Sequence, residues 1–158
     1  MLNAFFLLLA RLSLSLIFLI SGFNQLLNWY GSEKMLITAL SDWQGHIGSF
    51  MLIQNGLTFL VSWSSPLLAV GIALEILGGL MILTGFKDRL GAVFLILFLI
   101  PSTLLFHDFW FLEDAVRELQ VTMFLKNLAL IGSLVFVANH GVHGAKKNEG
   151  HHSYMGLS

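Results

Sequence analysis

The sequence predicts an all-α polytopic membrane protein: a four-transmembrane-helix bundle with an interfacial or re-entrant helix between spans one and two. Of the 158 residues, 56% are hydrophobic and 11% are charged, whereas a soluble domain carries about 25% charged residues. The mean hydropathy is +0.82. Four apolar runs are long enough to cross a hydrocarbon core of roughly 30 Å as helices. These observations exclude a water-soluble globular protein.

We expect one transmembrane domain over residues 1–145, followed by a flexible cytoplasmic tail over 146–158. The predicted spans cover about residues 4–27, 67–86, 90–106 and 121–139. The first run has no basic residue before it and is too long for a signal-peptide core, so we interpret it as a retained span.

The first span carries one helical stripe of polar and small residues. Arg11, Ser15, Phe18, Gly22 and Gln25 recur at helical spacing, which predicts that this face packs against other helices. Two interpretations of the arginine remain open. It either extends to the nearer headgroups or forms an ion pair inside the bundle.

The connection over residues 28–66 is the least regular part of the chain. Ser32 is typical of an N-cap and predicts a short helix through Leu40. The apolar run 47–63 is interrupted at its centre by Gln54, Asn55 and Gly56. We therefore favour a helix that lies at the interface or dips into the bundle, with a full fifth crossing as the alternative.

The second span contains a single charged residue, Glu75, near its middle. A carboxylate at that depth costs a few kcal/mol unless it is paired or protonated. Gly71 and Gly79 share its helical face, and Gly78 lies beside it. These glycines predict a close approach by a neighbouring helix.

The third and fourth spans carry the remaining irregular and polar positions. Pro101 predicts a kink in the third span. In the fourth span, Lys126 and Asn127 lie just over one turn from the start. Lys126, Ser133 and His140 are seven residues apart and share a face.

The distribution of basic residues predicts that both termini are cytoplasmic. Four spans place the two ends and the 86–89 loop on one side, where the basic residues are more numerous. That side holds Lys87, Arg89, Lys146 and Lys147, and the opposite side holds Lys34 and Arg117. Residues Trp29, Trp43, Trp63 and Trp110 fall on the opposite side, as an aromatic belt would.

The candidate site combines the charged residues that lie within the spans. By helical rise, Arg11 lies about 10 Å in from the cytoplasmic end and Glu75 about 12 Å in from the outer end. Lys126 lies roughly 6–8 Å in from the outer end, so two cations bracket the acid. This trio is either a polar clasp that fixes helix register or a pocket for a quinone or another polar headgroup.

Histidines add a further candidate and an exclusion. His107 and Asp108 lie at the outer mouth of this site, as a proton-handling or simply interfacial polar pair. His107 and His140 lie on opposite sides, so they cannot share a haem. His140, His143, His151 and His152 form a loose cluster that we interpret as tail rather than as a metal site.

Composition and motifs exclude several other kinds of chemistry. The chain has no cysteine, which excludes disulfides, a thiolate nucleophile and a cysteine-ligated iron–sulfur cluster. The formal net charge of −1 gives no indication of nucleic-acid binding. Nucleotide-binding and hydrolase motifs are absent from the sequence, so no catalytic residue is assigned.

The order of three segments resembles the DoxX family of small four-span membrane proteins. The segments are LIFLISGFNQL after Arg11, LEILGGLMILTGF, and MFLKNLALIGSLVFVANHG. The resemblance covers about residues 8–145, and its most specific parts are Glu75 with Gly78 and Gly79, and the Lys126–Asn127 pair. The family commonly has a lysine near the position of Gln25.

The resemblance implies an inner-membrane helical bundle. Members of the family resemble the membrane subunit of thiosulfate:quinone oxidoreductase, and others are linked to complexes with superoxide dismutase and a sulfurtransferase. We therefore expect a subunit or accessory factor of a membrane redox or stress-defence system. The alternatives are a small-solute transporter or channel, and an oligomerisation module that associates through Gly78 and Gly79.

Overall fold

The computed structural model describes residues 2–47 and 50–141, and every regular element in these ranges is a helix. The predicted tail over 146–158, with His143, His151 and His152, lies outside them. The elements follow one another as α1 (Leu2–Leu27), α2 (Trp29–Ile47), α3 (Met51–Ser62), α4 (Ser64–Thr84), α5 (Asp88–Phe106), the 3₁₀ turn η1 (Phe109–Phe111) and α6 (Asp114–His140).

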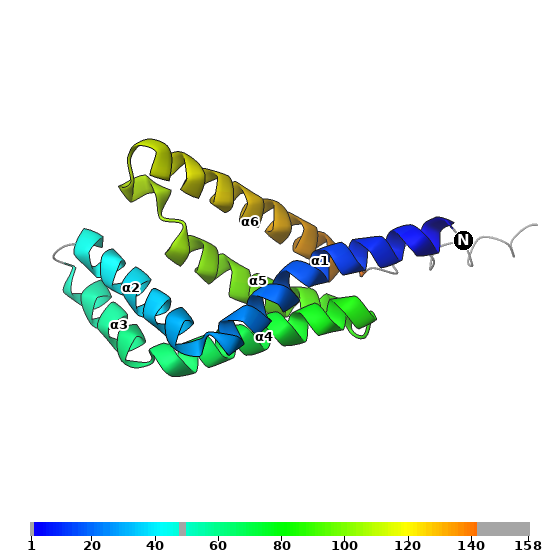
Figure 1. Ribbon diagram of the computed structural model, residues 1–158, viewed down its shortest axis with the longest axis horizontal. Coiled ribbons are helices and arrows are strands. Elements are labelled where there is room, and N and C mark those ends of the chain that lie inside the picture. Colours follow the sequence, from blue (N-terminus) through cyan, green and yellow to red (C-terminus); the bar gives the residue numbers. More distant parts are fainter. Residues whose placement is uncertain (1, 48–49, 142–158) are drawn as a thin grey trace, which may run out of the picture.

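Four of the helices are long and apolar enough to span a membrane, which confirms the predicted fold class. They are α1, α4, α5 and α6 (Figure 1). The α4–α5 loop lies at the same end of the bundle as the start of α1 and the end of α6. Two contacts show this: Arg11 packs on Gly85, and the Arg89 guanidinium donates to the His140 carbonyl at 3.3 Å.

Helices α2 and α3 form a hairpin at the other end of the bundle (Figure 1). The predicted N-cap at Ser32 is wrong, because α2 already begins at Trp29. The backbone N–H of Asn28 donates to the Asn24 carbonyl, and the N–H of Ser32 donates to the Asn28 carbonyl. Helical hydrogen bonding thus continues almost without a break from α1 into α2.

Helix α3 is too short to cross the membrane. Its 12 residues extend about 18 Å at 1.5 Å per residue, against a core of roughly 30 Å. It packs on α2 through a hydrogen bond from Gln44 Nε2 to Thr58 Oγ1 at 3.0 Å. The expected short helix between the first two spans is therefore confirmed, and the alternative of a fifth crossing is wrong.

Glycines bring α4 close to both of its neighbours, as their spacing predicts. A Cβ placed on Gly79 would lie 3.0 Å from the Leu19 side chain of α1. One placed on Gly78 would lie 2.7 Å from Leu95 Cγ and 2.9 Å from the Gly91 carbonyl oxygen of α5. The glycine face of α4 is thus occupied inside the chain.

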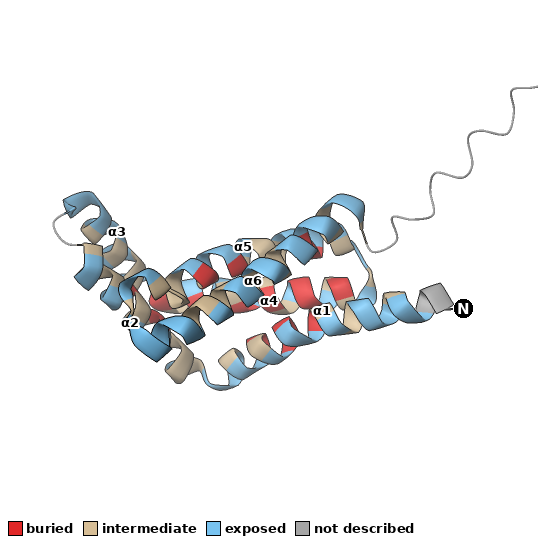
Figure 2. Cartoon of the chain, turned by 90° about the horizontal axis from the view of Figure 1, so that it is seen from above, coloured by how far each residue is buried: buried red, intermediate tan, exposed pale blue. Residues whose placement is uncertain are grey.

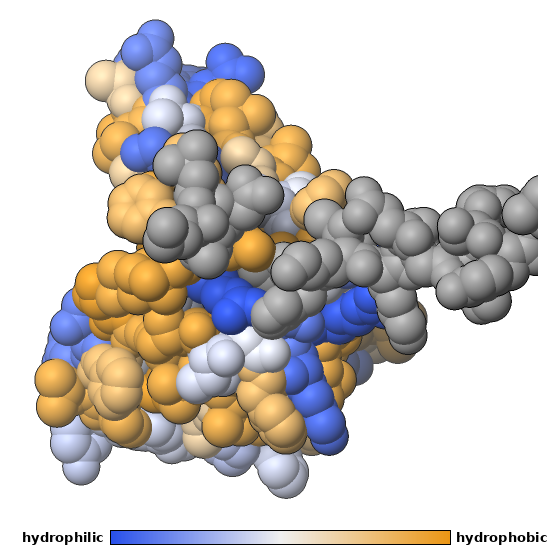
Figure 3. All heavy atoms as spheres, turned by 90° about the vertical axis from the view of Figure 1, so that its right-hand side faces the viewer, coloured by the Kyte–Doolittle hydropathy of each residue, from blue (hydrophilic) through white to orange (hydrophobic). Residues whose placement is uncertain are grey.

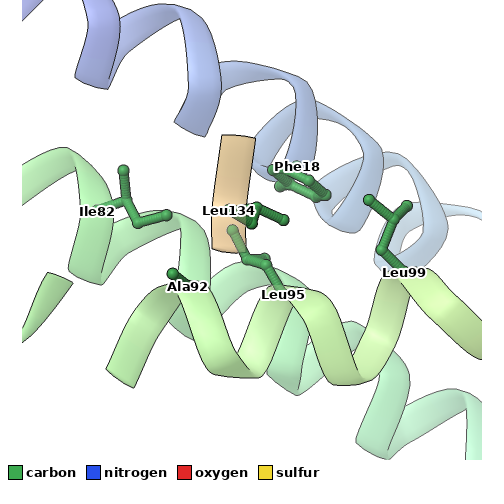
Figure 4. Packing of buried hydrophobic residues seen from close by; sticks show 6 residues of the cluster. All are labelled: Phe18, Ile82, Ala92, Leu95, Leu99 and Leu134. Atoms are coloured by element: carbon green, nitrogen blue, oxygen red, sulfur yellow. The ribbon is translucent and has the colours of Figure 1, made fainter. Parts of the chain in front are cut away.

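Six apolar side chains from four helices form the main core (Figure 4). They are Phe18 of α1, Ile82 of α4, Ala92, Leu95 and Leu99 of α5, and Leu134 of α6. Buried residues concentrate where α1, α4 and α5 meet (Figure 2). The predicted inward stripe of the first span is confirmed there, because Ser15, Phe18 and Gly22 are buried.

The outer surface is strongly apolar, as expected for a bundle surrounded by lipid. Seen from the end where α1 begins, apolar side chains cover much of the visible surface, and hydrophilic ones lie both near its centre and along its edges (Figure 3). Many large apolar side chains on the spans are about half exposed, including Ile17, Leu77 and Leu97. In a membrane these side chains face acyl chains.

Candidate functional site

A cavity of about 620 Å³ lies between the helices on the hairpin side of the core. Side chains of α1, α2, α4, α5 and α6 line it, and most of them are apolar. Its volume falls in the range of roughly 300–1,000 Å³ that is typical of small-molecule sites. The polar or ionisable side chains among its lining residues are Ser21, Gln25, Ser32, Glu75, Ser102, His107 and Asn127.

Glu75 is the charged residue of this cavity and is only 1% exposed. Gln25 Nε2 donates to Glu75 Oε2 at 2.8 Å and to Ser21 Oγ at 3.0 Å. The Ser21 hydroxyl is also a hydrogen-bonding neighbour of the carboxyl. Gly22 allows α1 to approach α4 closely beside Glu75, because a Cβ at Gly22 would lie 2.8 Å from Ile76 Cγ1.

Asn127 contributes to the cavity from α6 and is fixed by α5. Its Nδ2 donates to Thr103 Oγ1 at 3.0 Å, and the Thr103 hydroxyl donates to the Leu99 carbonyl at 2.6 Å. Thr103 is buried, with 3% of its surface exposed. The chain of hydrogen bonds therefore orients the Asn127 amide towards the bundle interior.

His107 lies where α5 ends, at the edge of the cavity. A hydrogen bond of 2.7 Å joins its Nδ1 to Gln120 Oε1 of α6. This bond links the last turn of α5 to the first part of α6. The imidazole is thereby held at the mouth of the cavity.

An aromatic cluster packs the hairpin against η1 near this mouth. Trp43 of α2 makes edge contacts with Trp110 and Phe111, with ring centroids 5.8 and 5.5 Å apart. Its indole N–H donates to the Leu105 carbonyl at 3.2 Å. Because carbonyls in the last turn of a helix have no intrahelical donor, this bond satisfies a group that α5 leaves open.

Of the six predicted site residues, three line the cavity: Glu75, His107 and Asn127. Asp108 follows α5 at the start of η1 and is not a lining residue. Lys126 is exposed on the outer surface of α6. Its neighbour Asn127 points inward, because successive helical residues project about 100° apart.

Arg11 does not bracket Glu75 as the depth estimate predicts. Its guanidinium packs against Gly85, so a Cβ there would lie 2.6 Å from Nη1. Gly85 is ten residues from Glu75, or about 15 Å along α4. The arginine therefore lies at the C-terminal end of α4, where the helix dipole favours a cation. The predicted arrangement of two cations around the acid is not formed.

The residues that do contact Glu75 were missed as site residues in the sequence. Gln25 belongs to the predicted inward stripe of α1, and this stripe was the available signal. Helices α1 and α4 run antiparallel, so facing positions have a nearly constant sum of residue numbers. The contacts Leu19–Gly79 and Arg11–Gly85 follow this rule, and it places Ser21 and Gln25 opposite Glu75.

With the cavity and the bundle defined, the comparison with known families decides the classification. A family model described as DoxX matches residues 6–108. The match covers more than half of the chain and runs from α1 through the end of α5. The chain belongs to the DoxX family.

This DoxX protein carries its family signature in α1 to α5, and α6 with Lys126 and Asn127 lies beyond the matched residues. A search of the curated proteins and a search of the solved structures found no match. Family membership and the four spanning helices make it a multi-pass membrane protein.

Proposed function

We propose that this DoxX protein is a ligand-binding subunit or accessory factor of a membrane redox or thiol-stress system. Its ligand is a quinone or a similar amphipathic molecule, with the polar headgroup beside Glu75. The observation that carries the proposal is a hydrogen-bonded carboxyl group lining an otherwise apolar cavity of about 620 Å³.

The rim of the cavity suits a ligand that arrives from the bilayer. Five of its large apolar lining residues are also exposed on the outside of the bundle: Ile17, Met35, Leu67, Val70 and Leu97. Acyl chains surround these positions in a membrane. A molecule dissolved in the bilayer therefore has a lateral route to Glu75 that does not cross water.

The polar lining residues suit a headgroup with carbonyl and hydroxyl oxygens. Amide and imidazole N–H groups donate to carbonyl oxygens, and carboxyl and amide oxygens accept from hydroxyls. Asn127 supplies the first kind, because only one of its two amide N–H groups is donated to Thr103. Glu75 and the amide oxygen of Gln25 supply the second, since both N–H groups of Gln25 are donated to Glu75 and Ser21. Since the chain has no cysteine, the proposed role in redox chemistry is to bind and orient a molecule that carries the electrons.

The other two functions predicted from the sequence have less support. A polar path through the bundle would have to pass the core around Ile82, Leu95 and Leu134, which are fully buried apolar residues. Oligomerisation through Gly78 and Gly79 would need a free glycine face, but both residues pack against helices of the same chain. Binding in the cavity accounts for the buried polar groups better than either.

Family resemblance and charge distribution complete the proposal. The soluble partners would be redox or sulfurtransferase proteins, and the location is the inner membrane with both termini in the cytoplasm. More basic residues in the segments at the α1-start end support this orientation.

The test measures binding of decylubiquinone to the full chain in lipid nanodiscs. Glu75→Gln replaces the carboxylate by a neutral amide. We expect the affinity for decylubiquinone to be about tenfold lower, because one hydrogen bond between a charged carboxylate and the headgroup contributes roughly 1.5 kcal/mol. Glu118→Gln is the matched control, since Glu118 is exposed near the start of α6. Equal affinity for both variants and the wild type would remove Glu75 from the site.

A second variant tests the cavity itself. Gly71 lines the cavity, and a Cβ there meets Phe98 at an ordinary 3.6 Å. Gly71→Leu therefore fills space that the ligand would occupy, and binding should be abolished while the bundle stays folded. Gly56→Leu on α3 is the control, because a Cβ at Gly56 meets nothing within 4 Å. Undiminished binding by Gly71→Leu would place the ligand elsewhere.

A further inference from the structure

Helix α6 is the least covered of the four spans. In its most apolar stretch 11% of the residues are buried, against 33% in α4. It packs on α5 and η1, and its large apolar side chains on the other side, such as Leu125, Leu128 and Phe136, are more than half exposed. One face of α6 is therefore left without a protein neighbour in the described part of the chain.

A groove of about 700 Å³ separates this face from α1. Small residues form much of its lining, including Ala10 and Ser13 of α1 and Ala129, Gly132 and Ser133 of α6. A Cβ placed on Gly132 would meet nothing within 4 Å. Small side chains on a membrane helix allow another helix backbone to approach closely.

Lys126 lies on the same exposed face of α6. The hydrogen bond between His107 and Gln120 sets the end of α5 level with Gln120, so Lys126 lies about 9 Å inside the span from that end. Lys126, Ala129, Ser133 and Phe136 alternate at three- and four-residue spacing, which is the pattern of a helix–helix seam. A lysine facing lipid at that depth is unfavourable, and within the described ranges no hydrogen bond or ion pair forms at its ammonium group.

We infer that this face of α6 docks a transmembrane helix of another membrane protein that carries a carboxylate at the depth of Lys126. The small residues of the groove accommodate the helix backbone, and the carboxylate compensates the lysine. The cavity around Glu75 is a separate site, because Lys126 is not among its lining residues.

Charge complementarity argues against a second copy of this chain as the occupant. Among the described spans, Glu75 is the only acidic residue away from the helix ends, and it is buried against Gln25. A second copy inserted in the same orientation would bring its own Lys126 to the same depth. Like charges at that depth repel, so the occupant must have a different sequence.

The experiment uses a defined helix as the probe. The full chain carries a donor dye on a cysteine introduced by Phe86→Cys, in the α4–α5 loop and away from the groove. Because the chain has no other cysteine, the dye attaches at this position alone. The probe is a synthetic helix of about 21 leucine and alanine residues with one glutamate about 9 Å from one end. Probes that insert with this end on the hairpin side place the glutamate at the depth of Lys126, and energy transfer in liposomes to an acceptor dye on the probe reports binding.

We expect the glutamate probe to bind about tenfold more tightly than an otherwise identical glutamine probe. Lys126→Leu should abolish this preference, whereas the control Lys34→Leu, on the exposed side of α2, should retain it. Decylubiquinone binding by Lys126→Leu should equal that of the wild type, which separates this inference from the proposed function and shows that the variant is folded.

Three results would overturn the inference. Equal binding of the two probes would mean that Lys126 extends alone to the headgroups. A glutamate preference that persists in Lys126→Leu would place the contact elsewhere. Efficient disulfide dimers of a Ser133→Cys variant at low protein-to-lipid ratio would show that a second copy occupies the groove.

Discussion

Helices α4 and α6 each carry one charged residue well inside a membrane span, but the two residues have opposite surroundings. Glu75 of α4 is 1% exposed and accepts a hydrogen bond from Gln25 of α1. Lys126 of α6 is exposed on the outer surface. The carboxyl of Glu75 is thus enclosed by the bundle, whereas the side chain of Lys126 lies on its surface.

Small residues explain the difference. The glycines of α4 meet α1 and α5 within the chain, so that neighbouring helices enclose Glu75 on both sides. Gly132 of α6 meets nothing, and α1 stays across a groove from it. The same kind of residue therefore indicates internal packing in α4 and an open face in α6.

The largest expected effect comes from exchanging small for large residues on the two helices. Gly78→Leu should lower the free energy of unfolding by about 3 kcal/mol, since its side chain would overlap Leu95 and the Gly91 carbonyl. Gly132→Leu should change it by less than about 0.5 kcal/mol. Unfolding of the purified protein in mixed micelles measures both, and similar losses would mean that α6 is packed as tightly as α4.

A smaller effect is expected from truncating the two charged residues. Glu75→Ala should cost about 2 kcal/mol of unfolding free energy, because the partly buried Gln25 amide loses an acceptor. Lys126→Ala should cost nothing measurable in the isolated protein. The same micelle assay applies, and a loss for Lys126→Ala as large as that for Glu75→Ala would show that the lysine has a partner inside the bundle.

The smallest expected effect distinguishes two adjacent residues of α6. Asn127→Ala removes the hydrogen bond to Thr103 and should cost about 1 kcal/mol. Lys126→Ala, one position earlier, is the control. If the cost for Asn127→Ala matched that of the control, the inward face of α6 would be held by apolar contacts alone.

The spans were predictable from the sequence because hydropathy over about 20 residues reflects a single physical requirement, the thickness of the bilayer. The inward face of α1 was predictable for a similar reason, since polar and small residues recur along it at helical spacing. The start of α2 was not, because Ser32 has the chemistry of a cap while the backbone at Asn28 already continues the helix.

The partner of Glu75 was harder to predict because depth gives only one coordinate. Arg11 and Lys126 both fall within the membrane, but contact also requires the right rotation about the helix axis and the right register. Register places Arg11 beside Gly85 and Gln25 beside Glu75. Rotation turns Lys126 outward and its neighbour Asn127 inward, which the charge of the residue alone does not indicate.

The α2–α3 hairpin begins and ends at the same face of the bundle, so the chain crosses the membrane an even number of times. The first turn of α1 and the last turn of α6 consequently open into one compartment, and the Trp43–Trp110 contact lies in the leaflet opposite to it. Reporter enzymes fused to either terminus should give the same readout, while one inserted between α2 and α3 should give the reverse.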